Sequence, residues 1–153
     1  MSYLSKVLQP GETIVYTTGL HWRIYLPAAG FLLAAGIVAV ASSSAGEGGA
    51  PVLHWVAALC ALAGIVSALA AAIRRASTEL AVTDRRVVYK RGILGRHTIE
   101  MNLSKVESVD VDQSIMGRIL GYGTIEVRGT GGSLEPFPNI SDPLGFRSYI
   151  TTR

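Results

Sequence analysis

The reactive side chains of this 153-residue chain are few and scattered. Its three histidines, His21, His54 and His97, lie far apart, and no spacing pairs any of them with a nucleophile. Asp110 and Asp112 are two residues apart, so on a strand they share one face, but two carboxylates are few ligands for a hard cation. We expect them to be solvated on the outer face of a strand. The sequence predicts no catalytic site, no metal site and no cofactor.

Two glycine-rich stretches have the look of binding motifs. Gly121–Gly123 resembles a fragment of a potassium filter, but it lacks the preceding Thr-Val and a pore helix. Gly129–Gly132 lacks the following helix that a phosphate-binding loop needs. We expect both stretches to be turns, because glycine readily adopts positive φ.

Basic residues gather between positions 74 and 96, where only Glu79 and Asp84 oppose them. Beside a bilayer, such a cluster suits an anionic lipid surface better than nucleic acid, because membrane attachment fixes which polyanion is nearest. Ordinary solvation of strand residues is the alternative, and the sequence does not decide between the two. The candidates for lipid-surface contact are Arg74, Arg75, Arg85, Arg86, Lys90, Arg91 and Arg96.

The basic residues follow two long apolar stretches, which must determine where they lie. Ile24–Ala41 and Val52–Ile73 contain no Asp, Glu, Lys or Arg and are joined by the short loop Ser42–Pro51. At about 1.5 Å per residue they reach roughly 27 and 33 Å, close to the thickness of a hydrocarbon core of about 30 Å. A buried helical pair of a soluble domain would show a polar stripe, and neither stretch has one. We predict a two-helix transmembrane hairpin over residues 24–73.

Residues typical of membrane interfaces flank both stretches. The first edge is marked by Trp22, Arg23 and Tyr25, and the opposite edge by His54 and Trp55. A proton-relay role for His54 has no partner carboxylate in either stretch, which favours the anchor.

Basic residues also predict the orientation of the hairpin. They stand only at its open end, as Arg23, Arg74 and Arg75, which places both termini in the cytoplasm and the loop outside.

Small residues recur at four-residue spacing in the hairpin, which favours close packing within it or between subunits. The sequence therefore favours a homo-oligomer or a larger membrane assembly. The spaced residues are Ala57 and Ala61, Gly64, Ala68 and Ala72, and Gly30 and Ala34.

The remainder, residues 74–153, shows short β-type runs separated by glycine-bearing turns, which indicates an antiparallel meander. A short helix is predicted over Asp142–Arg153, with Ser141 as its N-cap. Residues 1–23 include a β-like piece, Thr13–Thr18, which either adds a strand to this domain or lies at the headgroups. The predicted strands are Thr78–Thr83, Arg86–Lys90, Arg96–Met101, Lys105–Asp112, Thr124–Gly129 and Leu134–Pro138.

The order of several motifs is similar to that of a known family. Those motifs are Leu8–Glu12, His21-Trp22 ahead of the hairpin, Val82–Val87, Lys90–Arg96, Asn102–Val109 and Gln113–Ile125. Together they resemble the bacterial pleckstrin-homology-like (PH-like) membrane proteins. The resemblance implies an α+β membrane protein in which a curved antiparallel sheet is capped by a C-terminal helix, located in the bacterial inner membrane. The loop that binds phosphoinositides in eukaryotic relatives is reduced here to Thr83–Arg86, so no inositol-phosphate specificity is carried over.

These observations favour a non-enzymatic, membrane-anchored PH-like module that contacts a lipid surface or a protein. A transport or channel subunit built from several hairpins is the alternative, although its helices would offer only His54 as an ionisable group. A membrane enzyme would need a constellation of reactive groups that the sequence does not supply.

Overall fold

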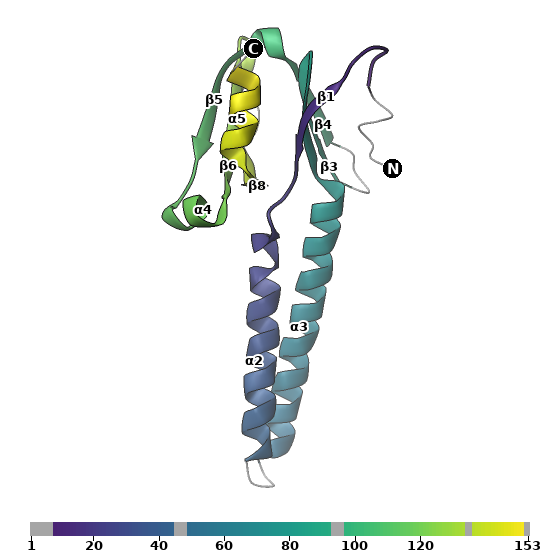
Figure 1. Cartoon of the computed structure of the whole chain (residues 1–153). Coiled ribbons are helices and arrows are strands. Elements are labelled where there is room, and N and C mark those ends of the chain that lie inside the picture. The colour runs from purple at the N-terminus through teal and green to yellow at the C-terminus, as the bar shows by residue number, and fades with distance from the viewer. Residues whose placement is uncertain (1–7, 45–48, 93–96, 134–135, 152–153) are drawn as a thin grey trace. The chain divides into compact units, whose positions relative to one another are not determined.

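The structure, a computed structural model, describes residues 8–44, 49–92, 97–133 and 136–151 (Figure 1). The chain divides into two compact units. The hairpin unit comprises Trp22–Ile73, and the β unit comprises the chain before and after it.

The hairpin unit is helical, as predicted. A 3-10 turn, η1 (Trp22–Tyr25), leads into α2 (Leu26–Ser43), and α3 (Ala50–Ser77) returns. Pro27 sits in the first turn of α2, where its missing amide hydrogen costs no helical bond. Both helices are long and apolar enough to cross a membrane. Leu32 lies beside Gly64, and Ser42 lies beside His54, so the helices run antiparallel.

Small side chains form the seam between the two helices. The buried positions repeat every seven residues, which keeps one narrow face of each helix toward the other. Gly64 allows the closest approach, since a Cβ there would lie 2.8 Å from the Leu32 side chain. The seam consists of Ala28, Ala35 and Ser42 on α2 and of Ala57, Gly64 and Ala71 on α3.

The first sheet of the β unit is antiparallel, with strand order β1-β2-β3-β4. Its strands are β1 (Ile14–Thr18), β2 (Glu79–Thr83), β3 (Arg86–Arg91) and β4 (His97–Asn102). The piece whose place the sequence left open is therefore a strand of this sheet. The whole hairpin is inserted in the connection between the paired strands β1 and β2.

The second sheet follows after a 3-10 turn, η2 (Leu103–Lys105). Strand β6 pairs with β5 along one edge and with β7 and β8 along the other, all antiparallel. The strands are β5 (Val106–Asp112), β6 (Tyr122–Gly129), β7 (Gly132–Ser133) and β8 (Phe137–Ser141). The prediction of Leu134–Pro138 is displaced by a few residues, and its positions 134 and 135 lie outside the described residues.

The core of the β unit lies between the two sheets, and the C-terminal helix α5 (Pro143–Thr151) covers it (Figure 1). Phe146 and Ile150 of α5 are buried against residues of both sheets. These core residues include Leu80, Val82, Val87, Tyr89, Val109, Ile125, Val127, Phe137 and Ile140. The predicted α+β architecture of a two-helix hairpin, antiparallel strands and a C-terminal helix is confirmed.

The cap of α5 differs from the prediction by one residue. Ser141 ends β8, and the carboxylate of Asp142 accepts a hydrogen bond of 3.1 Å from the Gly145 amide. Asp142 also accepts a bond of 2.8 Å from the Tyr16 hydroxyl on β1. Burial and this carboxylate raise the pKa of Tyr16 to about 12. Asp142 therefore caps α5 in place of Ser141, and the same side chain also binds the first strand.

Candidate functional site

One end of the β unit is where the chain enters and leaves the hairpin, and we call it the junction end. Here Thr18, at the end of β1, pairs with Leu80 near the start of β2. The amide of His21 donates a 2.7 Å bond to the Asn139 carbonyl, and the next residue is Trp22 of the hairpin unit. Both covalent connections to the hairpin therefore leave the β unit from the same end.

The opposite end of the same sheets, which we call the far end, holds the turn between β2 and β3. Strand β2 runs from Glu79 at the junction end to Thr83 at this turn. At about 3.3 Å per residue, the turn lies roughly 16 Å along the strand from Glu79. This distance exceeds the Debye length of about 8–10 Å at physiological salt.

This geometry divides the basic residues into two groups. Arg91 is exposed at the junction end, and Lys90 lies opposite Glu79 in the strand register. Arg74 and Arg75 are exposed in the last turn of α3, where positive charge complements the helix dipole, and three residues separate them from β2. Arg96 lies outside the described residues.

Arg85 and Arg86 lie at the far end, although in the sequence they stand between the basic residues of the junction end. The Arg85 side chain is exposed and has a distant ion pair of 3.9 Å with Asp84. The Arg86 side chain is only 12% exposed. Arg86 therefore has little guanidinium surface left for a lipid headgroup.

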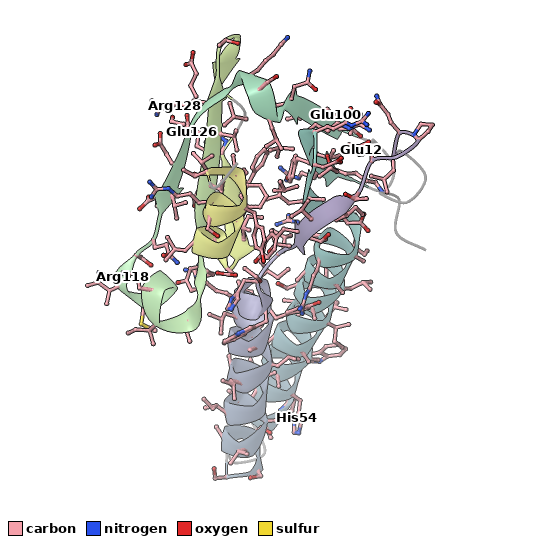
Figure 2. The ribbon with its side chains drawn as sticks, turned by 45° about the horizontal axis from the view of Figure 1, so that its top comes forward. Glu12, His54, Glu100, Arg118, Glu126 and Arg128 are labelled. Carbon is pink, nitrogen blue, oxygen red and sulfur yellow. The ribbon has the colours of Figure 1, made fainter. Side chains whose placement is uncertain are left out.

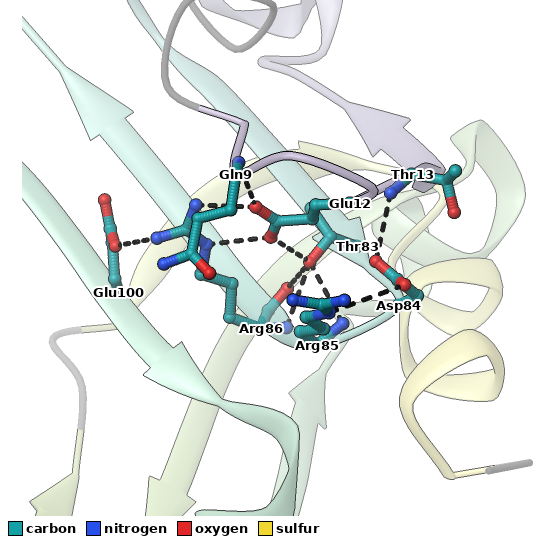
Figure 3. A network of polar contacts seen from close by, with 8 residues as sticks. All are labelled: Gln9, Glu12, Thr13, Thr83, Asp84, Arg85, Arg86 and Glu100. Carbon is teal, nitrogen blue, oxygen red and sulfur yellow. Dashed lines mark hydrogen bonds and ion pairs between the residues drawn. The ribbon is translucent and has the colours of Figure 1, made fainter.

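Arg86 is held by two carboxylates (Figure 3). Its Nε and Nη2 atoms donate bonds of 2.8 and 2.7 Å to the two oxygens of Glu12, in a bidentate arrangement. Its Nη1 atom donates a 2.6 Å bond to Glu100. Arg86 on β3 thus links Glu12, in the segment before β1, to Glu100 on β4. These segments lie far apart in the sequence.

A tight turn brings Glu12 to this position. Pro10 and Gly11 form the corner, with Gly11 at φ +81°, and the Glu12 amide donates to the Gln9 carbonyl. The Gln9 amide and the Thr83 hydroxyl each donate a 2.8 Å bond to the Glu12 carboxylate. The Leu8–Glu12 motif therefore acts by delivering one buried carboxylate to Arg86.

The electrostatic consequence is a carboxylate that stays ionised at low pH. The Arg86 hydrogen bonds lower the pKa of Glu12 from 4.5 to about 2, against the opposing effect of its burial. The same partnership raises the pKa of Arg86. The pair remains charged through the physiological range.

A polar cleft of about 600 Å³ opens beside this pair at the far end. Arg86 and Glu100 line the cleft and are paired with one another, and the other basic residues of its lining are Arg85, which has the 3.9 Å ion pair with Asp84, and Lys105. The cleft is also lined by Gln9, Glu12, Met101, Asn102 and Thr130–Gly132. Its mixed charge fits a polar partner better than a simple anion.

The predicted interface anchors fall at the two ends of the hairpin unit. Trp22, Arg23 and Tyr25 form η1, and the Trp22 side chain is exposed. Trp55 is 74% exposed near the start of α3. His54 contacts the Ala50 carbonyl at 2.6 Å and the Ser42 hydroxyl at 3.4 Å, so it links the two helices near their loop.

Sequence reasoning missed one exposed element, the short helix α4 (Ile115–Leu120). Ser114 caps it by accepting a 3.1 Å bond from the Gly117 amide, and Gly121 ends it at φ +74°. Ile115 and Ile119 are one helical turn apart between these caps, a signal that was readable in the sequence. Figure 2 shows Arg118 on this helix.

The residues weighed for enzymatic chemistry lie apart. Asp110 forms a 3.1 Å ion pair with Arg128 on the exposed face of the second sheet, and Arg128 also contacts Glu126 (Figure 2). His21 packs its ring beside Tyr122 at the junction end. Over the described ranges, no group of three or more His, Cys, Asp or Glu residues is placed to hold a metal ion.

Comparison with protein families identifies the family of this chain. A family model described as a bacterial PH domain matches residues 24–152, which include both helices of the hairpin and nearly all of the β unit after it. Searches of the curated proteins and of the solved structures found no match.

Proposed function

The chain belongs to the bacterial PH domain family, and we propose that it is a non-enzymatic PH-like module tethered to the cytoplasmic face of the bacterial inner membrane. The observation that carries this proposal is the hairpin unit, which buries small residues and exposes large apolar ones within the β1–β2 connection. Such a surface requires an apolar solvent. Its two covalent connections, both at the junction end, keep that end of the β unit beside the bilayer.

Lipid contact forms the first part of the proposed activity. Arg74, Arg75 and Arg91 are exposed near the points where the chain meets the hairpin, with Lys90 next to them. Each such cation near an anionic leaflet contributes about 1 kcal/mol of attraction. We propose that this junction-end group contacts anionic headgroups, whereas Arg85 at the far end faces away from them.

Protein contact forms the second part. The far-end cleft combines carboxylates, arginine and amide groups in its lining, which suits a polar protein segment. We propose self-association or assembly with another membrane protein through the hairpin, where Gly30 and Gly36 have open space at their Cα atoms. The alternative, a channel subunit in which several hairpins line a pathway, would have only His54 as an ionisable group in the two apolar stretches.

Two exposed arginines at opposite ends of the first sheet test the lipid part. The full chain in lipid nanodiscs, with a gadolinium chelate on the headgroups, reports which amides lie near the surface through broadening of their NMR signals. In anionic nanodiscs, we expect R91E to weaken broadening at the junction end by more than R85E does. Equal broadening in anionic and neutral nanodiscs for the unaltered chain and both variants would remove the lipid part of the proposal.

The oligomeric state tests the assembly part. Native mass spectrometry of the chain released from nanodiscs counts the copies and retains bound partners. A dimer or higher oligomer supports self-association, whereas a monomer without conductance in planar bilayers ends both self-association and the channel alternative.

A further inference from the structure

Helix α4 carries an apolar surface that the core of the β unit does not use. The side chains of Ile115, Met116 and Ile119 are 79%, 56% and 72% exposed. The amide of Asp142, just before α5, donates to the carbonyl of Gly121, just after α4, and Leu144 in the first turn of α5 is also exposed. Exposed apolar side chains that cluster on one short helix are unusual on a surface that faces water.

The fold specifies this outward orientation. Gly117 faces inward, where a Cβ would lie 2.6 Å from the Tyr122 carbonyl oxygen. The Gln113 side chain donates a 3.0 Å bond to that same oxygen. With Ser114 and Gly121 capping the two ends, the helix is fixed with its glycine inside and its large apolar residues outside.

The position of α4 indicates what covers it. Tyr122 directly follows the helix and its cap, and its ring centroid lies 5.2 Å from that of His21. His21 is the last residue of the β unit before the hairpin begins at Trp22. This ring contact places α4 at the junction end of the β unit, next to the residue that precedes the hairpin.

The charge on α4 also fits a lipid surface. Arg118 is exposed among the three apolar residues, and the helix contains no acidic residue. An apolar group flanked by a long cation is typical of segments that lie in the membrane interface, because the cation reaches the headgroups while its neighbours enter the acyl boundary.

We propose that α4 inserts Ile115, Met116 and Ile119 into the membrane interface and forms a third attachment of the β unit, beside its two covalent connections. This inference rests on the proposed membrane-spanning role of the hairpin. A second copy or another protein on α4 is the competing occupant.

Spin labels on the full chain in anionic nanodiscs test this inference. With Cys60 replaced by alanine, single cysteines are introduced at Ile115, Ile119, Ser108 and Leu62, each of which is exposed in its own unit. Collision rates with oxygen, which partitions into lipid, and with a water-soluble nickel chelate are then compared. We expect labels at 115 and 119 to show several-fold less nickel collision and more oxygen collision than the label at Ser108.

The control sites separate the possible failures. Nickel collision at 115 and 119 equal to that at Ser108 would overturn the α4 inference, and so would exclusion of both reagents with dipolar broadening between copies. Nickel access at Leu62 would instead contradict the membrane-spanning hairpin itself. Oxygen access at Leu62 together with aqueous α4 labels would leave the proposed function standing and remove only the third attachment.

Discussion

The hairpin unit and the β unit bury opposite kinds of side chain. In the hairpin unit, the seam contains alanine, serine and glycine, while Leu33, Ile37 and Val40 are about 70% exposed. In the β unit, Leu80, Phe137 and Phe146 are almost completely buried. This difference is expected if the hairpin unit faces lipid and the β unit faces water, because apolar side chains leave water but gain nothing by leaving lipid.

Helix α4 is the place where the β unit resembles the hairpin. Its large apolar residues point outward around an inward glycine, as in the hairpin seam. Helix α5 of the same unit behaves oppositely and turns Phe146 and Ile150 into the core. The comparison between units therefore predicts how substitutions of the same kind differ in effect.

A matched pair of phenylalanines gives the largest expected contrast. F146A removes a fully buried ring and should lower the free energy of unfolding of the β unit by about 3–5 kcal/mol. F31A alters a half-exposed ring of α2 and should leave that free energy nearly unchanged. Thermal unfolding of the full chain in nanodiscs, followed by near-ultraviolet circular dichroism, measures both. Equal losses for the two variants would contradict the comparison.

Acid should weaken the β unit through Glu12. Because its pKa falls from 4.5 to about 2 on folding, its contribution to stability is complete above about pH 4.5 and is lost as the pH falls toward 2. E12Q removes the bidentate one of the two carboxylates that hold Arg86 and leaves Glu100 as its charged partner, and should cost about 3 kcal/mol at neutral pH. It should also flatten this acid dependence.

The hairpin is an internal control for this experiment. Glu47 is the one carboxylate in its sequence between residues 22 and 73, so acid should change its stability little. Urea unfolding of the β unit between pH 2 and 7, for the unaltered chain and E12Q, measures the difference. The account of the Glu12–Arg86 pair fails if both chains lose stability in parallel across this range.

Two glycines of the hairpin, one inside the seam and one outside it, should respond differently to the same substitution. G64L places a large side chain against Leu32 in the seam and should destabilise helix packing by about 2 kcal/mol. G36L adds the same side chain where a Cβ meets nothing within 4 Å and should leave the seam intact. The distance between spin labels on α2 and α3 reports the outcome: it should increase in G64L alone. An increase in both variants would contradict the assignment of the seam.

The smallest effect is expected on α4. I115S and I119S alter exposed side chains, so in detergent each should change the free energy of unfolding of the β unit by about 0.5 kcal/mol or less. In nanodiscs the same variants should raise hydrogen exchange at the junction end, because the proposed third attachment is lost. Unchanged exchange in nanodiscs, or a large loss of stability in detergent, would contradict this assignment of α4.

Features with local sequence signals were predictable. Two long uncharged runs predicted the hairpin, and period-two patterns with glycine turns predicted most strands. The face of each helix was less predictable: the sequence suggested four-residue spacing that included Gly30, whereas the seam repeats every seven residues and leaves Gly30 exposed. The small residues that lie at the helix contact are selected by the partner helix, so the sequence of one helix alone does not determine them.

Long-range contacts account for the remaining differences. The pairing of β1 with β2 spans the whole hairpin, so no local pattern announces it. Arg86 read as a surface cation because its partner Glu12 lies 74 residues away. The short helix α4 lay inside a stretch read for its glycines, and its two caps were not combined into a helix prediction.

The topology of the chain in living bacterial cells tests the central claim most directly. In the background with Cys60 replaced by alanine, a cysteine at Ser44 near the hairpin loop is compared with one at Ser108 in the β unit, using a membrane-impermeant maleimide. The account predicts that Ser44→Cys is labelled in intact cells and that Ser108→Cys is labelled only after lysis. Labelling of both positions from the same side of the membrane would contradict a spanning hairpin that holds the β unit in the cytoplasm.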